Sequence, residues 1–197
     1  MLTISQYKVI FVAVGIIGIV FITALFISPF VIFTRGEQNS ELFLLNSRHT
    51  AEDFPFNFDL GKKYLMYIGV DNHMGSSAYY TLKLKLGNQT DSLPNSTSAT
   101  PSPLQSFCEY KFFVADNKSW EVPLTFSISN TSFEQNRSII NGININTVDY
   151  VLNKESEWNT NSTGYHYVLL VELWIFNSQL DLIQFDNRFV YLNMNIT

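Results

Sequence analysis

Residues 51–73 read AEDFPFNFDLGKKYLMYIGVDNH, and this stretch decides the fold class. From residue 64 onward, apolar side chains of one face recur at every second position, namely Tyr64, Met66, Ile68 and Val70. The positions between them are also largely apolar, and alternation with a period of two is typical of a β-strand. The segments 59–61, before the run, and 72–75, after it, have turn chemistry. The stretch therefore predicts a strand that is covered on both faces and bounded by two turns.

The same alternation continues along the chain. It predicts strands over Glu41–Leu45, Lys63–Asp71, Leu82–Leu86, Ser106–Ala115, Leu124–Ile128, Asn144–Leu152, Tyr165–Phe176 and Phe189–Ile196. Tyr165–Phe176 is apolar on both faces apart from Glu172, which indicates a central strand covered on each side. The Ser, Thr and Pro content of Gly87–Ser106 predicts an exposed, mobile loop, and Glu155–Gly164 predicts another. Short strands separated by turns favour an all-β fold, an antiparallel β-sandwich.

Length, charge and cysteine content limit the class of protein. The 197 residues suffice for one domain and a membrane segment. The net charge is −5 and no Lys/Arg cluster occurs, so no nucleic-acid partner is expected, because phosphate binding needs concentrated positive charge. Cys108 is the only cysteine, so no intrachain disulfide can form. A lone thiol is more often a small buried hydrophobe than a reactive group.

An apolar run near the amino terminus predicts a membrane anchor. Val9–Phe33 contains no charged residue, and a hydrocarbon core about 30 Å thick needs roughly 20 helical residues. A cleaved signal peptide would have a shorter apolar region, of about 7 to 15 residues, ended by small residues. We therefore expect a cytoplasmic tail over residues 1–8, a single transmembrane helix over residues 9–33 and an extracellular domain over residues 34–197.

Sequons for N-glycosylation support this orientation, because all of them follow the predicted helix. They are at Asn88, Asn95, Asn117, Asn130, Asn136, Asn161 and Asn195. Seven exceed the number, about three, that this content of Asn, Ser and Thr gives by chance. The expected partners are membrane lipid, covalent N-glycans and other membrane or envelope proteins, and the expected location is the cell membrane.

The stretch around residues 41–86 resembles the archaeal domain-of-unknown-function family 1616. The resemblance rests on Ala51-Glu52-Asp53-Phe54-Pro55, then Gly61 and Gly69, and then Asn72, His73 and Gly75. Later blocks around residues 120–121, 171–174 and 188–195 also resemble the family. The resemblance therefore covers about residues 41–196. Many members carry several membrane helices before this domain, whereas one is predicted here, and the segment 87–106 is an insertion. The resemblance implies an extracytoplasmic, immunoglobulin-like module of an archaeal protein and no known activity.

An outer β-sandwich with one cysteine also raises the hypothesis of a blue-copper protein. Such a site needs a Cys thiolate, two histidines and a weak axial Met. The twelve residues after Cys108 hold neither His nor Met, and His166 lies far downstream. Copper electron transfer is therefore only a third hypothesis.

Two further chemical hypotheses find little support in the spacing of residues. A metal site could combine Asp53 or Asp71 with the three histidines, His49, His73 and His166, but these lack the short paired spacing of zinc motifs. Glu52 and Asp53 could act as an acid/base pair, but adjacent residues of an extended segment point to opposite sides. No G-x-S-x-G motif occurs. We expect no catalytic residue, no cofactor and no metal.

The remaining hypothesis is a binding function. Aromatic side chains that form either a docking face or part of the core are Tyr79, Tyr80, Trp158, Tyr165 and Tyr167. We expect a non-enzymatic accessory or structural subunit of an archaeal envelope or membrane complex. The alternative is a stand-alone surface module that binds carbohydrate or a neighbouring protein.

Overall fold

The computed structural model describes residues 4–27 and 38–197, which belong to two separate units. The first unit contains the helix α1 (Ile4–Ile27). Residues 1–3 of the predicted tail and residues 28–33 of the predicted span lie outside the described residues. Within the described part of the chain, no helical segment reaches the length and hydropathy that a membrane crossing requires.

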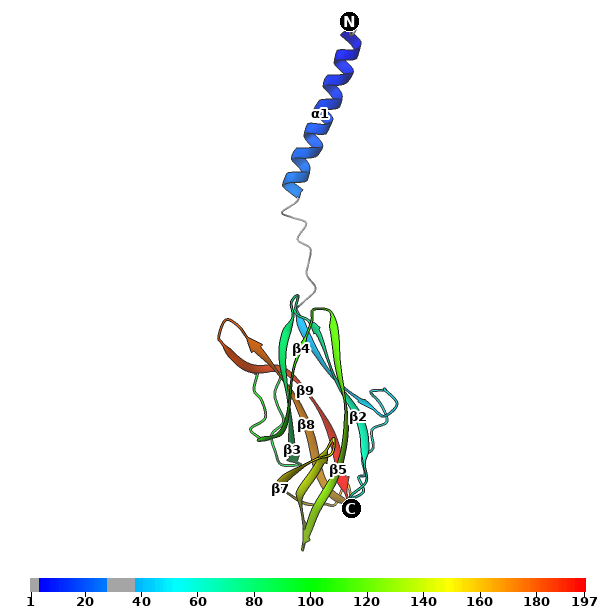
Figure 1. Cartoon of the computed structure of the whole chain (residues 1–197), viewed down its shortest axis with the longest axis vertical. Coiled ribbons are helices and arrows are strands. Elements are labelled where there is room, and N and C mark those ends of the chain that lie inside the picture. The colour runs from blue at the N-terminus through cyan, green and yellow to red at the C-terminus, as the bar shows by residue number, and fades with distance from the viewer. Residues whose placement is uncertain (1–3, 28–37) are drawn as a thin grey trace. The chain divides into compact units, whose positions relative to one another are not determined.

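Residues 38–197 form an all-β unit (Figure 1). Its strands are β1 (Asn39–Asn46), β2 (Tyr64–His73), β3 (Ala78–Asn88), β4 (Ser106–Val114), β5 (Lys118–Glu134), β6 (Arg137–Ile145), β7 (Val148–Asn159), β8 (Gly164–Asn177) and β9 (Leu182–Ile196). All pairings between these strands are antiparallel. The prediction of an all-β, antiparallel domain is therefore confirmed for this unit.

The strand order is that of an immunoglobulin-like sandwich with one added hairpin. One layer contains β1-β2-β5, and the other contains β4-β3-β8-β9. In chain order these correspond to strands A, B and E of one sheet and to C′, C, F and G of the other. The hairpin β6–β7 extends the first layer beyond β5, and Trp158 and Asn159 at the end of β7 pair with the start of β8. The two layers are thus joined at one end.

The hairpin β6–β7 corrects one sequence-based prediction. A single strand over Asn144–Leu152 is wrong, because the chain reverses at Asn146 and Thr147. Both residues have positive φ, 47° and 74°, as two-residue hairpin turns of type I′ require. The loop predicted over residues 155–164 is also shorter than expected, because β7 continues to Asn159.

The core lies between the layers and follows the predicted alternation. Leu82 and Leu84 of β3 and Ile68 of β2 are completely buried. Phe112 of β4 stacks on Trp120 of β5 across the two layers, with ring centroids 3.6 Å apart and planes inclined by 6°. Each large apolar side chain that is removed from water contributes about 1.5–3 kcal/mol, so this contact surface is the main source of stability.

Buried asparagines organise the turns of the Ala-Glu-Asp and Asn-His motifs. The Asn46 amide donates to the Glu52 carbonyl and the Thr50 hydroxyl, at 2.6 and 2.7 Å. The Asn72 amide donates to the carbonyls of Ser76 and Val114, both at 2.8 Å. Since unpaired polar groups are costly in the interior, these bonds fix the two turns, and the motif residues have structural roles.

Gly69 of the same motif leaves room for an aromatic ring on the neighbouring strand. Phe43 of β1 lies directly opposite Gly69 of β2. A β-carbon added to Gly69 would lie 2.0 Å from the tip of the Phe43 ring. Only glycine therefore accommodates the ring in its present position.

We predict that Gly69→Ala destabilises the domain, because the Phe43 ring must leave its place above β2. The expected loss in the free energy of unfolding is about 1–3 kcal/mol, measured by urea denaturation. Removing the ring relieves the clash, so Phe43→Ala/Gly69→Ala should be more stable than the sum of the two single changes allows. Strictly additive losses would contradict this account.

Candidate functional site

The acidic pair in the Ala-Glu-Asp motif does not form an acid/base site. Glu52 and Asp53 are both exposed. The Asp53 carboxylate accepts a hydrogen bond from the Arg48 guanidinium at 2.9 Å, and both side chains are more than two-thirds exposed. Asp53 has a φ of 56°, a conformation that Asp tolerates in turns. This geometry indicates a surface turn.

The three histidines lie in different surroundings. The ring of His49 stacks on Tyr67 and its Nε2 lies 3.3 Å from a Glu121 carboxylate oxygen. The Nδ1 of His73 lies 3.3 Å from the Asn117 side-chain oxygen, so it does not bond to backbone as a hairpin histidine often does.

His166 is the third histidine, and burial lowers the pKa of its imidazole. Among the described residues, no group of three His, Cys, Asp or Glu side chains has the geometry to hold a metal ion.

Cys108 is buried in a cluster of tyrosines where β4 faces β7. The Tyr150 hydroxyl donates to the Cys108 sulfur at 3.3 Å. This hydrogen bond and burial raise the pKa of Tyr150 to about 12. Burial, followed by the neighbouring thiol, raises the pKa of Tyr110 to about 12. Both phenols are therefore neutral hydrogen-bond donors at physiological pH.

A buried ion pair lies on the outer face of the second layer. The Lys85 ammonium of β3 is 2.7 Å from a Glu172 carboxylate oxygen of β8, and the side chains are only 5% and 0% exposed. Trp174 Nε1 donates to the same carboxylate at 3.0 Å. Removing two charges from water is costly unless further hydrogen bonds satisfy them.

The segment between β3 and β4 supplies those further bonds. The Ser102 backbone amide donates to Glu172 at 2.7 Å, and its carbonyl accepts from the Lys85 ammonium at 2.8 Å. Ser102 is 4% exposed. The prediction of an exposed, mobile loop over Gly87–Ser106 is therefore wrong around Ser102, because the segment is fixed there by a buried charge pair, whereas residues 95–100 are exposed.

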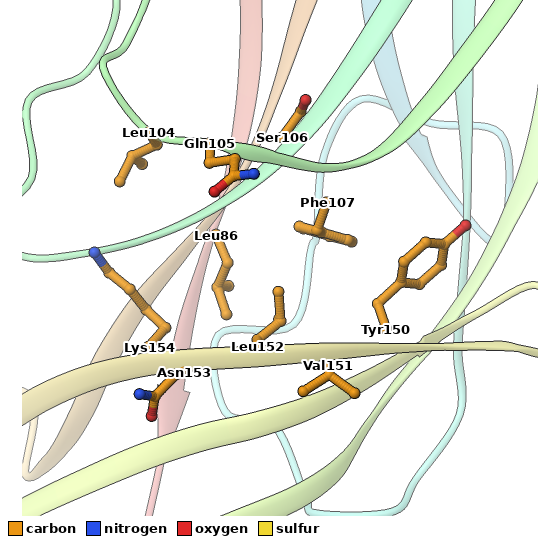
Figure 2. A pocket seen from close by; sticks show the side chains of 10 residues that line it. All are labelled: Leu86, Leu104, Gln105, Ser106, Phe107, Tyr150, Val151, Leu152, Asn153 and Lys154. Atoms are coloured by element: carbon orange, nitrogen blue, oxygen red, sulfur yellow. The ribbon is translucent and has the colours of Figure 1, made fainter.

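A cleft of about 560 Å³ opens where this segment meets β7 (Figure 2). Leu104–Ser106 form one side and β7 forms the other, with Leu86 and Phe107 between them. The residues that line it are Leu86, Leu104, Gln105, Ser106, Phe107, Tyr150, Val151, Leu152, Asn153 and Lys154. The Lys154 ammonium at its edge pairs with Asp91, which leaves an apolar floor with a polar, nearly neutral rim.

Both strands that border the cleft have one free edge. β4 ends the strand order of its layer, and among the described strands it pairs with β3 alone. β7 pairs with β6 over residues 148–157, and within the described residues no strand pairs with its other edge there. The Asn88 amide caps this edge at the Glu155 carbonyl, at 2.8 Å. The backbone between Val148 and Asn153 is therefore open to a further strand.

The predicted glycan acceptors differ in their accessibility. Exposed asparagines are Asn95, Asn117, Asn130, Asn136 and Asn161, and Asn88 is half-buried. Asn195 is only 1% exposed, and its amide donates to Asn57 Oδ1 at 3.0 Å and to the Ser162 carbonyl at 3.2 Å. A glycan there would have to replace both bonds. Occupancy of every acceptor stays a prediction.

The predicted aromatic docking face is largely core. Tyr80, Tyr165 and Tyr167 are buried. Tyr79 is half-buried against Phe113, with ring centroids 4.7 Å apart. Only Trp158 is exposed, at 37%, and it contacts Tyr165 edge-on.

A second polar cluster lies inside the sandwich, at the start of β1. The hydroxyls of Ser40 and Tyr80 are 2.8 Å apart, and Tyr80 also donates to Asn72 at 3.1 Å. Asp186 of β9 lies beside them, and burial raises its pKa to about 6, against the opposing effects of Ser40 and the Arg188 charge. One Asp186 carboxylate oxygen is buried without a hydrogen-bond partner in the described structure.

A family profile with the description "domain of unknown function (DUF1616)" matches residues 34–139. A comparison with curated protein sequences gives no significant match.

Three of the similar solved structures come from different classes of protein. A CARDB domain from Pyrococcus furiosus, solved with two metal ions, is 5% identical, with 83% of this chain and 97% of that chain covered and a TM-score of 0.40. A β-glucosidase from Listeria innocua is 11% identical, with 82% and 16% covered and a TM-score of 0.36. The sporulation control protein Spo0M from Bacillus subtilis is 8% identical, with 81% and 91% covered and a TM-score of 0.28. What those proteins bind or do belongs to them alone, and the chain spans only a sixth of the glucosidase.

We predict that breaking the buried ion pair is far more damaging than breaking a surface pair. Lys85→Met leaves the Glu172 carboxylate buried without its cation, and the free energy of unfolding should fall by about 3–5 kcal/mol. Arg48→Met, at the exposed pair with Asp53, should cost no more than about 1 kcal/mol. Urea denaturation measures both. Lys85→Met/Glu172→Gln should recover part of the loss, and equal effects at the two pairs would contradict the assignment.

We also predict that Asp186 makes the domain relatively more stable in acid. Its pKa is raised in the folded state from 3.8 to about 6, so its contribution is complete below pH 3.8 and is lost as the pH rises through about 6. The loss corresponds to about 2–3 kcal/mol. The free energy of unfolding should therefore decrease less between pH 4 and pH 7 in Asp186→Asn than in the unchanged protein. The same substitution at the exposed Asp181 is the control, and identical pH profiles for both variants would refute the prediction.

Proposed function

The chain belongs to the DUF1616 family of domains of unknown function, and from that premise we propose that it is a single-pass, membrane-anchored extracellular protein without enzymatic activity. In this proposal it serves as an accessory subunit that holds a neighbouring protein of a membrane or envelope complex. The archaeal envelope that the sequence resemblance implies is part of the same proposal.

The apolar amino-terminal segment supports the membrane anchor. Val9–Phe33 has no charged residue, and α1 is helical over Ile4–Ile27. Large apolar side chains of this helix are exposed, such as Phe11 at 84% and Val14 at 64%. A helix that is apolar all round is typical of a membrane segment or of the centre of a large assembly. All seven sequons follow this segment, which supports an external location for residues 34–197.

The observation that carries the binding role is the cleft between the free edges of β4 and β7. An extended peptide can add a strand to an open sheet edge through main-chain hydrogen bonds, while alternate side chains enter an apolar groove. Here the open edge is β7 between Val148 and Asn153, and the groove floor is formed by Leu86, Phe107 and Leu152. We infer that the occupant is an extended, apolar segment of a neighbouring protein. A highly charged segment is disfavoured, because Asp91 already neutralises the Lys154 charge.

The amides at the rim favour carbohydrate as the alternative ligand. Gln105 and Asn153 line the cleft together with the aromatic rings of Phe107 and Tyr150. Aromatic faces with nearby amides also suit sugars, which combine apolar faces with hydroxyl groups. In that case the protein would act alone as a surface binding module.

We predict that Val151→Arg removes the partner without unfolding the domain. Val151 lines the cleft and is 91% exposed, so a bulky charge there blocks the groove and the free edge at little cost to folding. The full chain is purified from native membranes in mild detergent, and the amount of partner retained is measured by mass spectrometry. We expect at least a tenfold loss, since central interface contacts carry most of the binding energy.

Leu60→Arg is the control for this experiment. Leu60 is 45% exposed in the turn before β2 and lies outside both the cleft lining and the open edge of β7. A partner that both variants retain equally would refute the cleft as the binding site. A chain that purifies as a monomer, binds oligosaccharides and loses this binding in the Val151→Arg variant would favour the carbohydrate-binding alternative.

A further inference from the structure

An exposed apolar band crosses one end of the second layer. Its members are Tyr79, Phe113, Phe176, Leu180 and Ile183. Phe113 is 74% exposed and Leu180 is 61% exposed, and the other members are exposed or half-buried. Neither the core nor the cleft uses these side chains. Contiguous apolar surface of this kind marks a contact with protein or membrane.

Strand register shows that the band is continuous. Tyr79 of β3 lies opposite Phe113 of β4, and their rings are 4.7 Å apart. On the other side, Phe176 of β8 lies opposite Ile183 of β9. The pairing of Tyr80 with Ile175 brings Tyr79 alongside Phe176, one position further along both strands. The band then extends to the tip of the β8–β9 hairpin, which projects from the sandwich (Figure 1).

The band lies at the end of the domain where β1 begins. The Arg188 guanidinium of β9 donates to the Ser40 carbonyl at 3.0 Å, and the Ser40 hydroxyl is 2.8 Å from the Tyr80 hydroxyl. Ser40 is the second residue of β1, so β9 near its hairpin, the start of β3 and the start of β1 share this end. Only ten residues, 28–37, separate α1 from the described domain. A membrane that contains α1 therefore tethers this end of the domain.

Charge around the band fits a neutral lipid interface. Between Phe176 and Gln184 the only charged side chain is Asp181, and Lys111, two positions before Phe113 on β4, is paired with Glu109 at 3.6 Å, so little net charge is present to select anionic lipid. Aromatic and aliphatic side chains of this kind bind the boundary between headgroups and acyl chains. Most exposed sequons lie away from this end. Asn130 and Asn136 flank the far turn of β5–β6, and Asn161 precedes β8, whereas Asn117 is an exception near the band.

We propose that this band rests on the lipid bilayer that contains α1, with the β8–β9 hairpin in the headgroup region. The inference rests on the membrane anchoring proposed above. The contact fixes the orientation of the domain on the membrane surface and directs the β5–β6 turn away from it.

Site-directed fluorescence on the full chain tests this contact. The protein is reconstituted in nanodiscs of zwitterionic phosphatidylcholine, with Cys108→Ser so that one introduced cysteine carries an environment-sensitive NBD dye. Ile183→Cys places the dye in the band, because Ile183 lies opposite Phe176. Val151→Cys is the matched control, because Val151 is also exposed but lines the cleft. Lipids with a doxyl group on the acyl chain quench a dye in contact with lipid, and iodide quenches a dye in water.

We expect lipid quenching of the Ile183 dye to be at least threefold stronger than that of the Val151 dye, with the opposite order for iodide. A chain that is not retained by the nanodiscs contradicts the membrane anchoring and, with it, this contact. If the chain is retained but iodide quenches both dyes equally, the contact alone is refuted. An Ile183 dye that is shielded from both quenchers means that protein covers the band, which also refutes it.

Discussion

The buried ion pair between Lys85 and Glu172 is the interaction on which the functional surface depends. The segment between β3 and β4 covers both side chains on the outer face of the sheet and removes their charges from water, where a single unpaired charge would cost several kcal/mol. The two charges therefore pair with each other and with both backbone groups of Ser102, and these bonds fix the segment in place. The same segment continues directly into Leu104–Ser106, which form one side of the cleft. An electrostatic requirement in the middle of the sheet thus sets the shape of a groove at its edge.

The two proposed contact surfaces have different physical origins. The cleft exists because the added hairpin β6–β7 continues one layer while β4 ends the other, so their edges face each other without pairing. The apolar band exists because the β8–β9 hairpin extends beyond the neighbouring strands and leaves its side chains without a covering layer. Free edges are usually protected against unwanted pairing. Here the Asn88 amide protects one part of β7 and leaves the adjoining part open.

Sequence periodicity predicted most of the strands, because in a two-layer sandwich every second side chain must leave water. It also identified β8 as covered on both sides, and Glu172 was the visible exception. The turn at Asn146 and Thr147 was missed because Ile145, Thr147 and Val148 are β-branched and favour a continuous strand, although Asn146 is a residue type that tolerates the positive φ of such turns. The cleft could not be predicted from the sequence, since Leu86, Phe107 and Leu152 come from three separate segments. Their convergence depends on sheet order, which period-two patterns do not encode.

The far end of the domain is closed by contacts between segments that are very distant in the chain. The backbone of Asn195 exchanges hydrogen bonds with Phe56 and Phe58, and its side chain bonds Asn57, 138 positions earlier. Gly164 has no β-carbon, which leaves the space that the Asn195 side chain occupies. Such high contact order slows folding, because loop closure must precede the stabilising contacts. During synthesis, the early segment around residues 54–58 must therefore wait for β9, and this end of the domain can close only after β9 has been made.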